Sequence, residues 1–280
     1  MKVESIYRLI DAAIEEDIGD GDHTSLASIP AGATGSARLI IKEKGILAGI
    51  NMAEIIFKKI DPGITFESYI SDGSQINPGD TGFLVNGSQQ ALLKAERLVL
   101  NVLQRMSGIA TETRKYVNAV EGYDARILDT RKTTPGFRIF EKEAVRIGGG
   151  LNHRMGLYDM IMLKDNHIDF AGGIREAIVK TNSYLEETGR KLQIEIEARS
   201  VEDVKVIMDA GGVSRIMLDN FSITDTKKAV KIINGRFEIE SSGGITLETI
   251  REYAACGVDF ISVGALTHQI RSLDMSMKVI

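Results

Sequence analysis

The chain has 280 residues, of which 43% are hydrophobic and 26% charged, with a formal net charge of −5 and an isoelectric point near 5.5. A chain of this length forms one large domain or two smaller ones, and its ordinary composition excludes a disordered or low-complexity protein. The acidic balance argues against a broad nucleic-acid-binding surface, and the single cysteine, Cys256, excludes an internal disulfide and a cysteine zinc site.

The N-terminal stretch is amphipathic and acidic. It places Ile6, Leu9, Ile10 and Ala13 at helical spacing among acidic residues. It has neither the unbroken apolar centre nor the small-residue cleavage site of a signal peptide. We therefore expect a cytoplasmic protein that spans no membrane.

The next segment alternates short strand-like runs with turn signals. The runs are ARLIIKE (37–43), ITFESYI (64–70) and GFLVNG (82–87), and they surround a helical stretch at 51–59. This pattern predicts a small α+β domain. Residues 89–120 then carry apolar side chains at helical spacing, with a candidate break near Ser107-Gly108, and we expect this long helix to bridge two domains.

The second half repeats one unit: an apolar strand, a short polar loop and a helix. The predicted strands are ARILD (125–129), DMIMLK (159–164), LQIEIEA (192–198), RIMLD (215–219), FEIESS (237–242) and DFISVG (259–264). Buried strands joined by helices form a parallel sheet. Six or seven such units in about 150 residues favour a closed or nearly closed α/β barrel that lacks a unit, and a doubly wound open sheet is the alternative.

Reactive groups in α/β barrels lie on the loops that follow the strands. Any single polar residue at a strand end could have a purely structural role, with acidic residues capping helices and basic residues covering loops. Six successive strands that end in polar residues favour a functional site instead. The residues at the ends are Asp129, Arg131, Lys132, Lys164, Asp165, Asn166, Glu195, Glu197, Asp219, Asn220, Ser241, Ser242, Gly243, Gly244 and Gly264.

Two of these ends have the composition of a phosphate site. ESSGGIT (240–246) and SVGALTH (262–268) place glycine between a strand and a helix, where a phosphate can approach backbone N–H groups. Glu197 and Asp219, on neighbouring strands, offer the hard oxygen ligands that suit Mg²⁺ and could equally hold ribose hydroxyls. Alternatively, Glu197 and Asp219 could serve only as salt-bridge partners of nearby Arg and Lys residues.

Positive charge is concentrated in one region. Between Arg126 and Lys164 there are eight Lys or Arg residues against four Asp or Glu. One phosphate does not need so many cations, so we expect a polyphosphate and a second anionic substrate that arginine forks recognise. The cations are Arg131, Lys132, Arg138, Arg154 and Lys164. His153, His167 and His268 lack the spacing of a zinc site.

Eight blocks of the chain, in order from residue 15 to residue 268, resemble the quinolinate phosphoribosyltransferase family, the decarboxylating nicotinate-nucleotide pyrophosphorylases. The blocks are EEDIGDGDHTS (15–25), AERLVLNVLQRMSGIAT (95–111), LDTRKTTPGFR (128–138), GGGLNHRMGLYDMIMLKDNHI (148–168), IEIEA (194–198), IMLDN (216–220), ESSGGI (240–245) and SVGALTH (262–268).

The resemblance implies an N-terminal α/β sandwich packed on an incomplete, six- or seven-stranded parallel α/β barrel. On this basis we place the sandwich and bridging helix in residues 1–110, the barrel in 111–268, and a C-terminal segment that returns to the first domain in 269–280. It also implies a homodimer whose active sites are shared between subunits, with higher oligomers open. The implied reaction joins quinolinate and phosphoribosyl pyrophosphate (PRPP), with Mg²⁺, to give nicotinate mononucleotide, pyrophosphate and CO₂ in NAD biosynthesis.

Residue roles follow from the same resemblance. Arg97 of the partner subunit, Arg131, Arg154 and Lys164 would hold the quinolinate carboxylates. Lys132, His153 and Lys164 would lie between the two substrates and take part in catalysis. Glu197 and Asp219 would serve catalysis, the ribose hydroxyls and Mg²⁺, either directly or through substrate or water. The PRPP-binding groups would be Lys132, Glu197, Asp219, Ser242, Gly243, Gly244, Gly264 and His268.

Two other functions stay open. A paralogue of the same fold, such as the homologue of molybdenum operons, need not use quinolinate; the presence of Arg97, Arg131, Arg154 and Lys164 favours quinolinate. A non-catalytic sensor would bind PRPP without consuming it.

Overall fold

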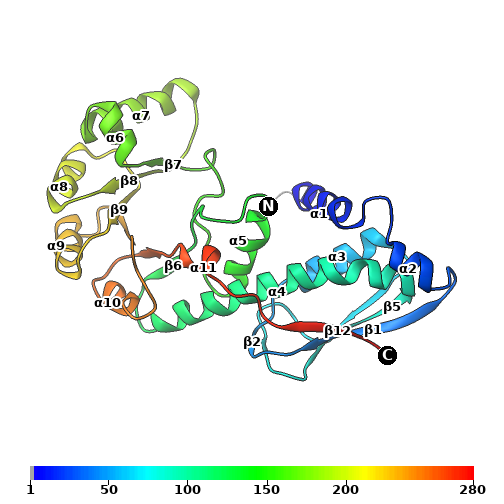
Figure 1. Cartoon of the computed structure of the whole chain (residues 1–280). Helices are drawn as coiled ribbons and strands as arrows, with labels where there is room; N and C mark the ends of the chain where they lie inside the picture. Colours follow the sequence, from blue (N-terminus) through cyan, green and yellow to red (C-terminus); the bar gives the residue numbers. More distant parts are fainter. Residues whose placement is uncertain (1–2) are drawn as a thin grey trace. The chain divides into compact units, whose positions relative to one another are not determined.

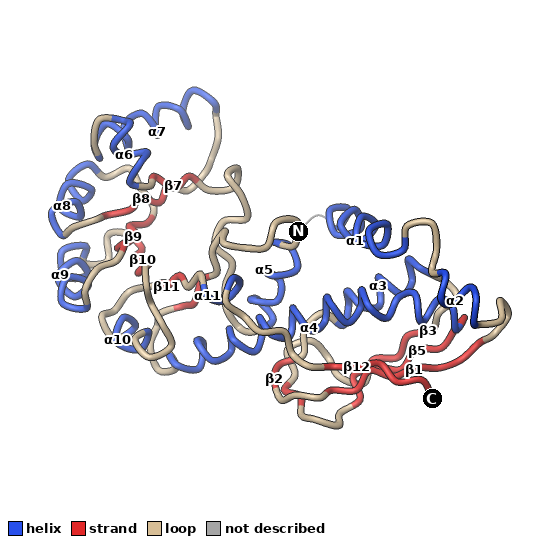
Figure 2. Tube along the Cα trace, in the orientation of Figure 1, coloured by secondary structure: helices blue, strands red, loops and turns tan. Residues whose placement is uncertain are grey.

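The computed structural model describes residues 3–280, which divide into two compact units (Figures 1 and 2). The first unit runs to Arg114 and includes residues 133–149 and 266–280, and the second comprises residues 115–132 and 150–265. Two segments that lie within the barrel range of the sequence, 133–149 and 266–268, therefore group with the N-terminal residues. Among the described residues, none of the helices combines the length and apolar character needed to cross a membrane.

The first unit is built on a four-stranded sheet of order β12-β1-β5-β3, in which all neighbours are antiparallel. The elements are α1 (Val3–Ile18), α2 (His23–Ser28), β1 (Thr34–Ile41), β2 (Gly45–Ile46), α3 (Ile50–Ile60), β3 (Thr65–Ser68), β4 (Gln75–Ile76), β5 (Thr81–Ser88), the first part of α4 (Gln89–Ala119), α5 (Arg138–Ile147), the end of α11 (Ala265–His268) and β12 (Met275–Val279).

One face of this sheet is apolar and covered by α3 and α4 (Figure 2). Leu39 and Ile41 alternate with more exposed residues along β1, and Phe83 and Val85 do the same on β5. This period of two buries one face of a strand and leaves the other open. The C-terminal strand β12 extends the sheet by pairing with β1.

Helix α4 is continuous through Ser107 and Gly108, so the expected break does not occur. The Ser107 hydroxyl bonds the backbone of Ala48 at 2.9 and 3.2 Å, and the helix is therefore anchored there rather than interrupted. A Cβ on Gly108 would lie 2.3 Å from the carbonyl oxygen of Arg271. The glycine allows close packing of the C-terminal segment against α4.

The second unit contains a six-stranded parallel sheet of order β6-β11-β10-β9-β8-β7, with helices on its outer side (Figure 1). The elements are β6 (Arg126–Leu128), β7 (Ile161–Leu163), α6 (Asp165–Ala171), α7 (Ile174–Thr188), β8 (Ile194–Ala198), α8 (Val201–Ala210), β9 (Arg215–Asp219), α9 (Ile223–Ile233), β10 (Glu238–Ser242), α10 (Ile250–Ala254) and β11 (Phe260–Ser262).

The strand order identifies an incomplete barrel. Successive strands β7 to β11 lie side by side, and the first strand, β6, pairs with the last, β11. This cyclic order differs from that of a doubly wound sheet, whose order reverses part-way. Leu151 forms a single parallel bridge to Leu128 of β6, which supplies the remnant of a seventh strand before β7. The predicted incomplete six- or seven-stranded barrel is confirmed.

Candidate active site

Parallel strands end at the same edge of a sheet, and three charged side chains meet at this edge. Lys164, directly after β7, forms an ion pair with Glu197 near the end of β8. The backbone N–H of Asp165 donates to the same carboxylate at 3.2 Å. Burial and the negative charge of Glu197 raise the pKa of Asp219 at the end of β9. The two predicted metal or ribose ligands, Glu197 and Asp219, therefore lie close enough for their charges to interact.

The Asp219 carboxylate is tied to the next loop through Asn220. Asn220 adopts a left-handed conformation with φ of 55°, its side-chain amide donates to Asp219 at 2.8 Å, and its backbone N–H donates to the Ser242 carbonyl at 2.8 Å. A Cβ on Gly243 would lie 2.2 Å from Asn220 Oδ1, so only glycine fits there. Gly244 has a φ of 60° and no atom within 4 Å of the position of a Cβ.

The predicted cation cluster is partly assembled within the second unit. Burial and the positive charge of Arg131 lower the pKa of Arg154, so these two guanidinium groups lie near enough to repel each other. Arg154 is half-buried and donates from Nη1 to the Met160 carbonyl at 3.2 Å, whereas Arg131 and Lys132 are exposed in the loop after β6. Neighbouring cations of this kind form a binding site for an anion.

Three other predicted residues belong to the first unit. Arg97 is exposed on α4, Arg138 opens α5 and donates to Thr133 Oγ1 at 2.9 Å, and His268 is exposed at the end of α11. Their predicted roles stay predictions, as does that of Gly264 after β11. His167 accepts the backbone N–H of Lys164 at 3.1 Å and so supports the start of α6.

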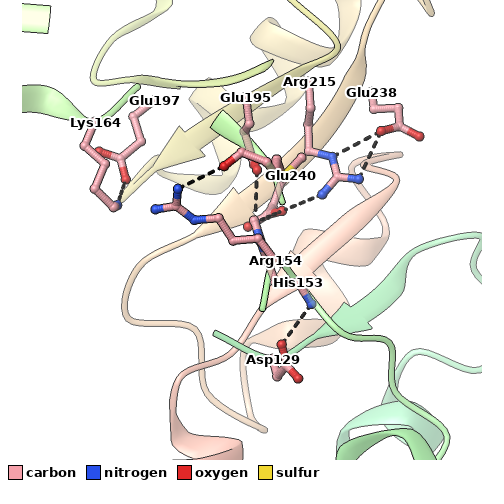
Figure 3. Close-up of polar contacts among 10 residues, drawn as sticks. Asp129, His153, Arg154, Lys164, Glu195, Glu197, Arg215, Glu238 and Glu240 are labelled. Carbon is pink, nitrogen blue, oxygen red and sulfur yellow. Dashed lines mark hydrogen bonds and ion pairs between the residues drawn. The ribbon is translucent and has the colours of Figure 1, made fainter. Parts of the chain in front are cut away.

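Figure 3 shows a charged cluster on the inner face of the sheet, where the predicted residues His153 and Glu195 join three that the sequence interpretation did not assign, Arg215, Glu238 and Glu240. Arg215 on β9 lies 3.1 Å from Glu240 and 3.0 Å from Glu238, both on β10. His153 Nε2 lies 2.9 Å from Glu195 and 3.4 Å from Glu240, and both glutamate side chains are fully buried. Charge attraction between His153 or Arg215 and the buried carboxylates therefore contributes to holding this group together.

The cluster has a signal in the sequence. Glu195 and Glu197 on β8, Arg215 and Asp219 on β9, and Glu238 and Glu240 on β10 each stand an even number of residues apart. Because side chains alternate along a strand, these charges share one face, and the intervening isoleucines and leucines face the helices. Period-two charge in strands buried on both sides indicates a polar barrel interior.

Matches to protein families agree with this geometry. The chain matches the model of the quinolinate phosphoribosyl transferase N-terminal domain over residues 22–107 and that of the C-terminal domain over residues 109–278. The chain belongs to the quinolinate phosphoribosyltransferase family. The predicted family is therefore confirmed over nearly the whole sequence.

Individual relatives support this membership. The chain is 44% identical to quinolinate phosphoribosyltransferase [decarboxylating] 2b, mitochondrial, of Nicotiana tabacum, over 98% of this chain and 82% of the relative. It is 41% identical to the probable nicotinate-nucleotide pyrophosphorylase [carboxylating] of Bacillus subtilis, over 98% and 93% of the two chains. The crystal structure of NadC from Streptococcus pyogenes superposes with a TM-score of 0.94 at 38% identity, covering 100% of this chain and 98% of that one.

Proposed function

We propose that this chain transfers the phosphoribosyl group of PRPP to quinolinate and releases pyrophosphate and CO₂, giving nicotinate mononucleotide for NAD biosynthesis. The observation that carries the proposal is the proximity of a repelling pair, Arg131 and Arg154, to the charged group Lys164, Glu197 and Asp219 in one barrel. The arginine pair suits a dicarboxylate, and the group of Lys164, Glu197 and Asp219 suits a phosphoribosyl donor. Family membership identifies these anions as quinolinate and PRPP.

The dicarboxylate would be held by arginine forks. Arg131 and Arg154 would each present a planar pair of donors to a carboxylate, and Lys164 would add a point charge. Arg97 of the partner subunit would complete this set, in a homodimer whose active sites are shared. Lys132 and His153 would lie between the two substrates.

The PRPP side would use the strand ends and the glycine loops. Glu197 and Asp219 would take the ribose hydroxyls, and the open space at Gly244 is compatible with a phosphate there. The phosphate-binding groups would be Ser242, Gly243, Gly244, Gly264, His268 and Lys132.

Mg²⁺ fits the same carboxylates. Burial and the negative charge of Glu197 raise the pKa of Asp219, so a divalent cation would stabilise the two carboxylates when both are ionised. We propose that Glu197 and Asp219 hold Mg²⁺, directly or through substrate or water. When bound, the ion would neutralise charge on the pyrophosphate group.

The chemistry requires mainly position and charge from the protein. As pyrophosphate departs, the ribosyl carbon becomes cationic, and the carboxylates of Glu197 and Asp219 stabilise it. The pyridine nitrogen of quinolinate then forms the new bond, which makes the ring cationic. The adjacent carboxylate then departs as CO₂ and leaves its bonding electron pair on the ring carbon. The cationic nitrogen stabilises this pair until the carbon takes up a proton from water, so Arg131 and Arg154 need only orient the ring.

Product analysis tests the proposal. Purified protein incubated with quinolinate, PRPP and Mg²⁺ should release CO₂ and pyrophosphate in equal amounts and form nicotinate mononucleotide. Consumption of PRPP with another aromatic acid but not with quinolinate would support the paralogue. Binding of PRPP without turnover would support the sensor.

Subunit exchange tests the shared site. Arg97→Ala damages the donated residue and Lys132→Ala damages the barrel, so a mixed dimer would carry one intact site. Random exchange makes about half the dimers mixed, and about a quarter of all sites should regain activity under two-fold symmetry. Verified exchange of tagged subunits without regained activity would show that Arg97 does not act across the interface.

We propose that the protein acts in the cytoplasm, whereas relatives from Nicotiana tabacum and Arabidopsis thaliana are named mitochondrial and chloroplastic. A fluorescent fusion of the natural gene product, viewed in its own cells, would test it.

A further inference from the structure

The reaction proposed above leaves the buried cluster of His153, Glu195, Glu240 and Arg215 without a role in proton transfer. Barrel interiors are usually filled by branched aliphatic side chains. A buried ion cluster seldom adds stability over an apolar core of the same volume. This barrel nevertheless has Glu195 and Glu240 fully buried, and Arg215 is only 8% exposed. The cluster therefore calls for an explanation other than stability.

His153 connects this cluster to the predicted carboxylate site. Its Nε2 faces Glu195 and Glu240, whereas its Nδ1 accepts the backbone N–H of Arg154 at 2.6 Å. Its own backbone N–H donates to Asp129 Oδ1 at 2.8 Å, and Asn152 donates to the other oxygen of Asp129 at 2.7 Å. The segment before Arg154 is thus fixed from two sides by buried groups.

The hydrogen bond at Nδ1 decides which ring nitrogen carries the proton. Nδ1 accepts the backbone N–H of Arg154, and an acceptor nitrogen cannot also carry a proton. The proton of the ring is therefore on Nε2, which faces the carboxylates of Glu195 and Glu240.

We propose that His153 is a positioning residue: Glu195, Glu240 and Arg215 fix its imidazole ring, and the ring holds the backbone of Arg154 so that the guanidinium is oriented for the carboxylates of the substrate. His153 then neither donates nor accepts a proton in the reaction. The family resemblance implies a catalytic role for His153 between the substrates, and this proposal restricts that role to positioning Arg154. The proposal rests on the proposed function of Arg154.

Substitutions at His153 separate positioning from acid–base chemistry. Asparagine places an oxygen near the position of Nδ1 and can accept the N–H of Arg154, but it cannot transfer a proton. Alanine offers no acceptor. We expect His153→Ala to weaken quinolinate binding roughly tenfold or more, because a half-buried N–H loses its partner, and His153→Asn to recover most of that loss. The measurements are titration calorimetry with quinolinate and the quinolinate KM set against kcat.

A matched pair on β10 tests the cluster without altering His153. Glu240→Gln keeps the shape but removes the charge that faces His153 and Arg215, whereas Glu238→Gln alters a half-exposed partner of Arg215 at the start of the same strand. We expect quinolinate KM to rise several-fold in Glu240→Gln, with the PRPP KM unchanged, and both to stay within about twofold in Glu238→Gln. If His153→Ala fails to fold, the comparison of Glu240→Gln with Glu238→Gln still tests whether the cluster positions Arg154.

Three outcomes would overturn the proposal. His153→Asn that binds quinolinate normally but loses kcat as fully as His153→Ala would restore an acid–base role. Equal quinolinate KM values in Glu240→Gln and Glu238→Gln would mean that the cluster does not act on Arg154. Stoichiometric metal in the purified wild-type protein that disappears in Glu240→Gln would make His153, Glu195 and Glu240 a metal site instead. Absence of all quinolinate turnover in the wild type would refute the proposed function, a result distinct from these.

Discussion

The two sheets of this protein bury different chemistry. In the first unit the covered face is apolar, with Phe83 packed against Phe66 and Phe57 at ring-centroid distances of 4.7 and 5.9 Å. In the second unit the face toward the helices is equally apolar, but the inner face carries Glu195, Arg215 and Glu240. Removing charged groups from water is costly, whereas burying aromatic rings is favourable. The difference indicates that apolar faces stabilise the fold of each unit separately, and that the charged inner face of the barrel is kept for function.

The largest expected effect on stability lies in the apolar sheet. Phe83→Ala deletes a fully buried ring and should lower the free energy of unfolding by about 3–5 kcal/mol. Denaturant unfolding followed by circular dichroism measures this. Phe170→Ala, at a position 93% exposed, is the control and should change stability by less than about 0.5 kcal/mol. Equal losses in the two variants would contradict an aromatic core in this unit.

At the strand ends of the barrel we expect a substitution to lower activity and raise stability. Asp219→Asn should lower kcat roughly 10²- to 10³-fold, the size found when one preorganised electrostatic group is removed, while quinolinate binding stays nearly intact. Because burial and Glu197 raise the pKa of Asp219, its ionised form destabilises the fold, and stability is lost as the pH rises through that pKa. The variant should therefore melt higher than the wild type at pH 7.

A pH series sharpens this result. The difference in melting temperature between Asp219→Asn and the wild type should shrink as the pH is lowered toward 3.8, the ordinary pKa of an aspartic acid. A variant that melts below the wild type at pH 7 would show that Asp219 stabilises the fold. Loss of quinolinate affinity in that variant would instead place Asp219 in the dicarboxylate site.

Arg154 should give a smaller effect that falls on binding. Arg154→Ala removes charge-assisted hydrogen bonds worth about 1.5–3 kcal/mol each, so quinolinate affinity should fall roughly ten- to hundredfold. Arg154→Lys should rescue it only in part, because an ammonium cannot reproduce a planar fork. Arg199→Ala is a control, since this exposed arginine pairs with Asp169 at 2.9 Å. Full quinolinate affinity in Arg154→Lys would reduce Arg154 to a point charge.

The sequence predicts the elements of the barrel better than its interior. All six predicted strands are present, because each is a short apolar run that glycine, polar loops and helical spacing delimit. The pairing of Glu195 with Arg215 and of Arg215 with Glu238 depends on strand register, which no single strand specifies. The break expected at Gly108 was wrong because a helical glycine can serve close packing from a segment far along the chain. Family membership names the substrates, but it does not locate Arg97 in a dimer.

The smallest effect tests the link between the strand end and the glycine loop. Asn220→Gly keeps the left-handed backbone at no steric cost but removes the amide that orients Asp219, so the PRPP KM should rise roughly two- to tenfold, the value of one hydrogen bond. Asn220→Ala loses the same amide and adds backbone strain of about 1–2 kcal/mol, so it should also melt lower.

Gly243→Ala should raise the PRPP KM more than either Asn220 variant, since its Cβ would meet Asn220 Oδ1 at 2.2 Å. Combining Gly243→Ala with Asn220→Gly removes the clashing side chain, so a double-mutant cycle should show that part of the lost PRPP affinity returns. Strict additivity of the two changes would mean that Asn220 and Gly243 do not contact each other, and that Asp219 and the glycine loop are oriented independently.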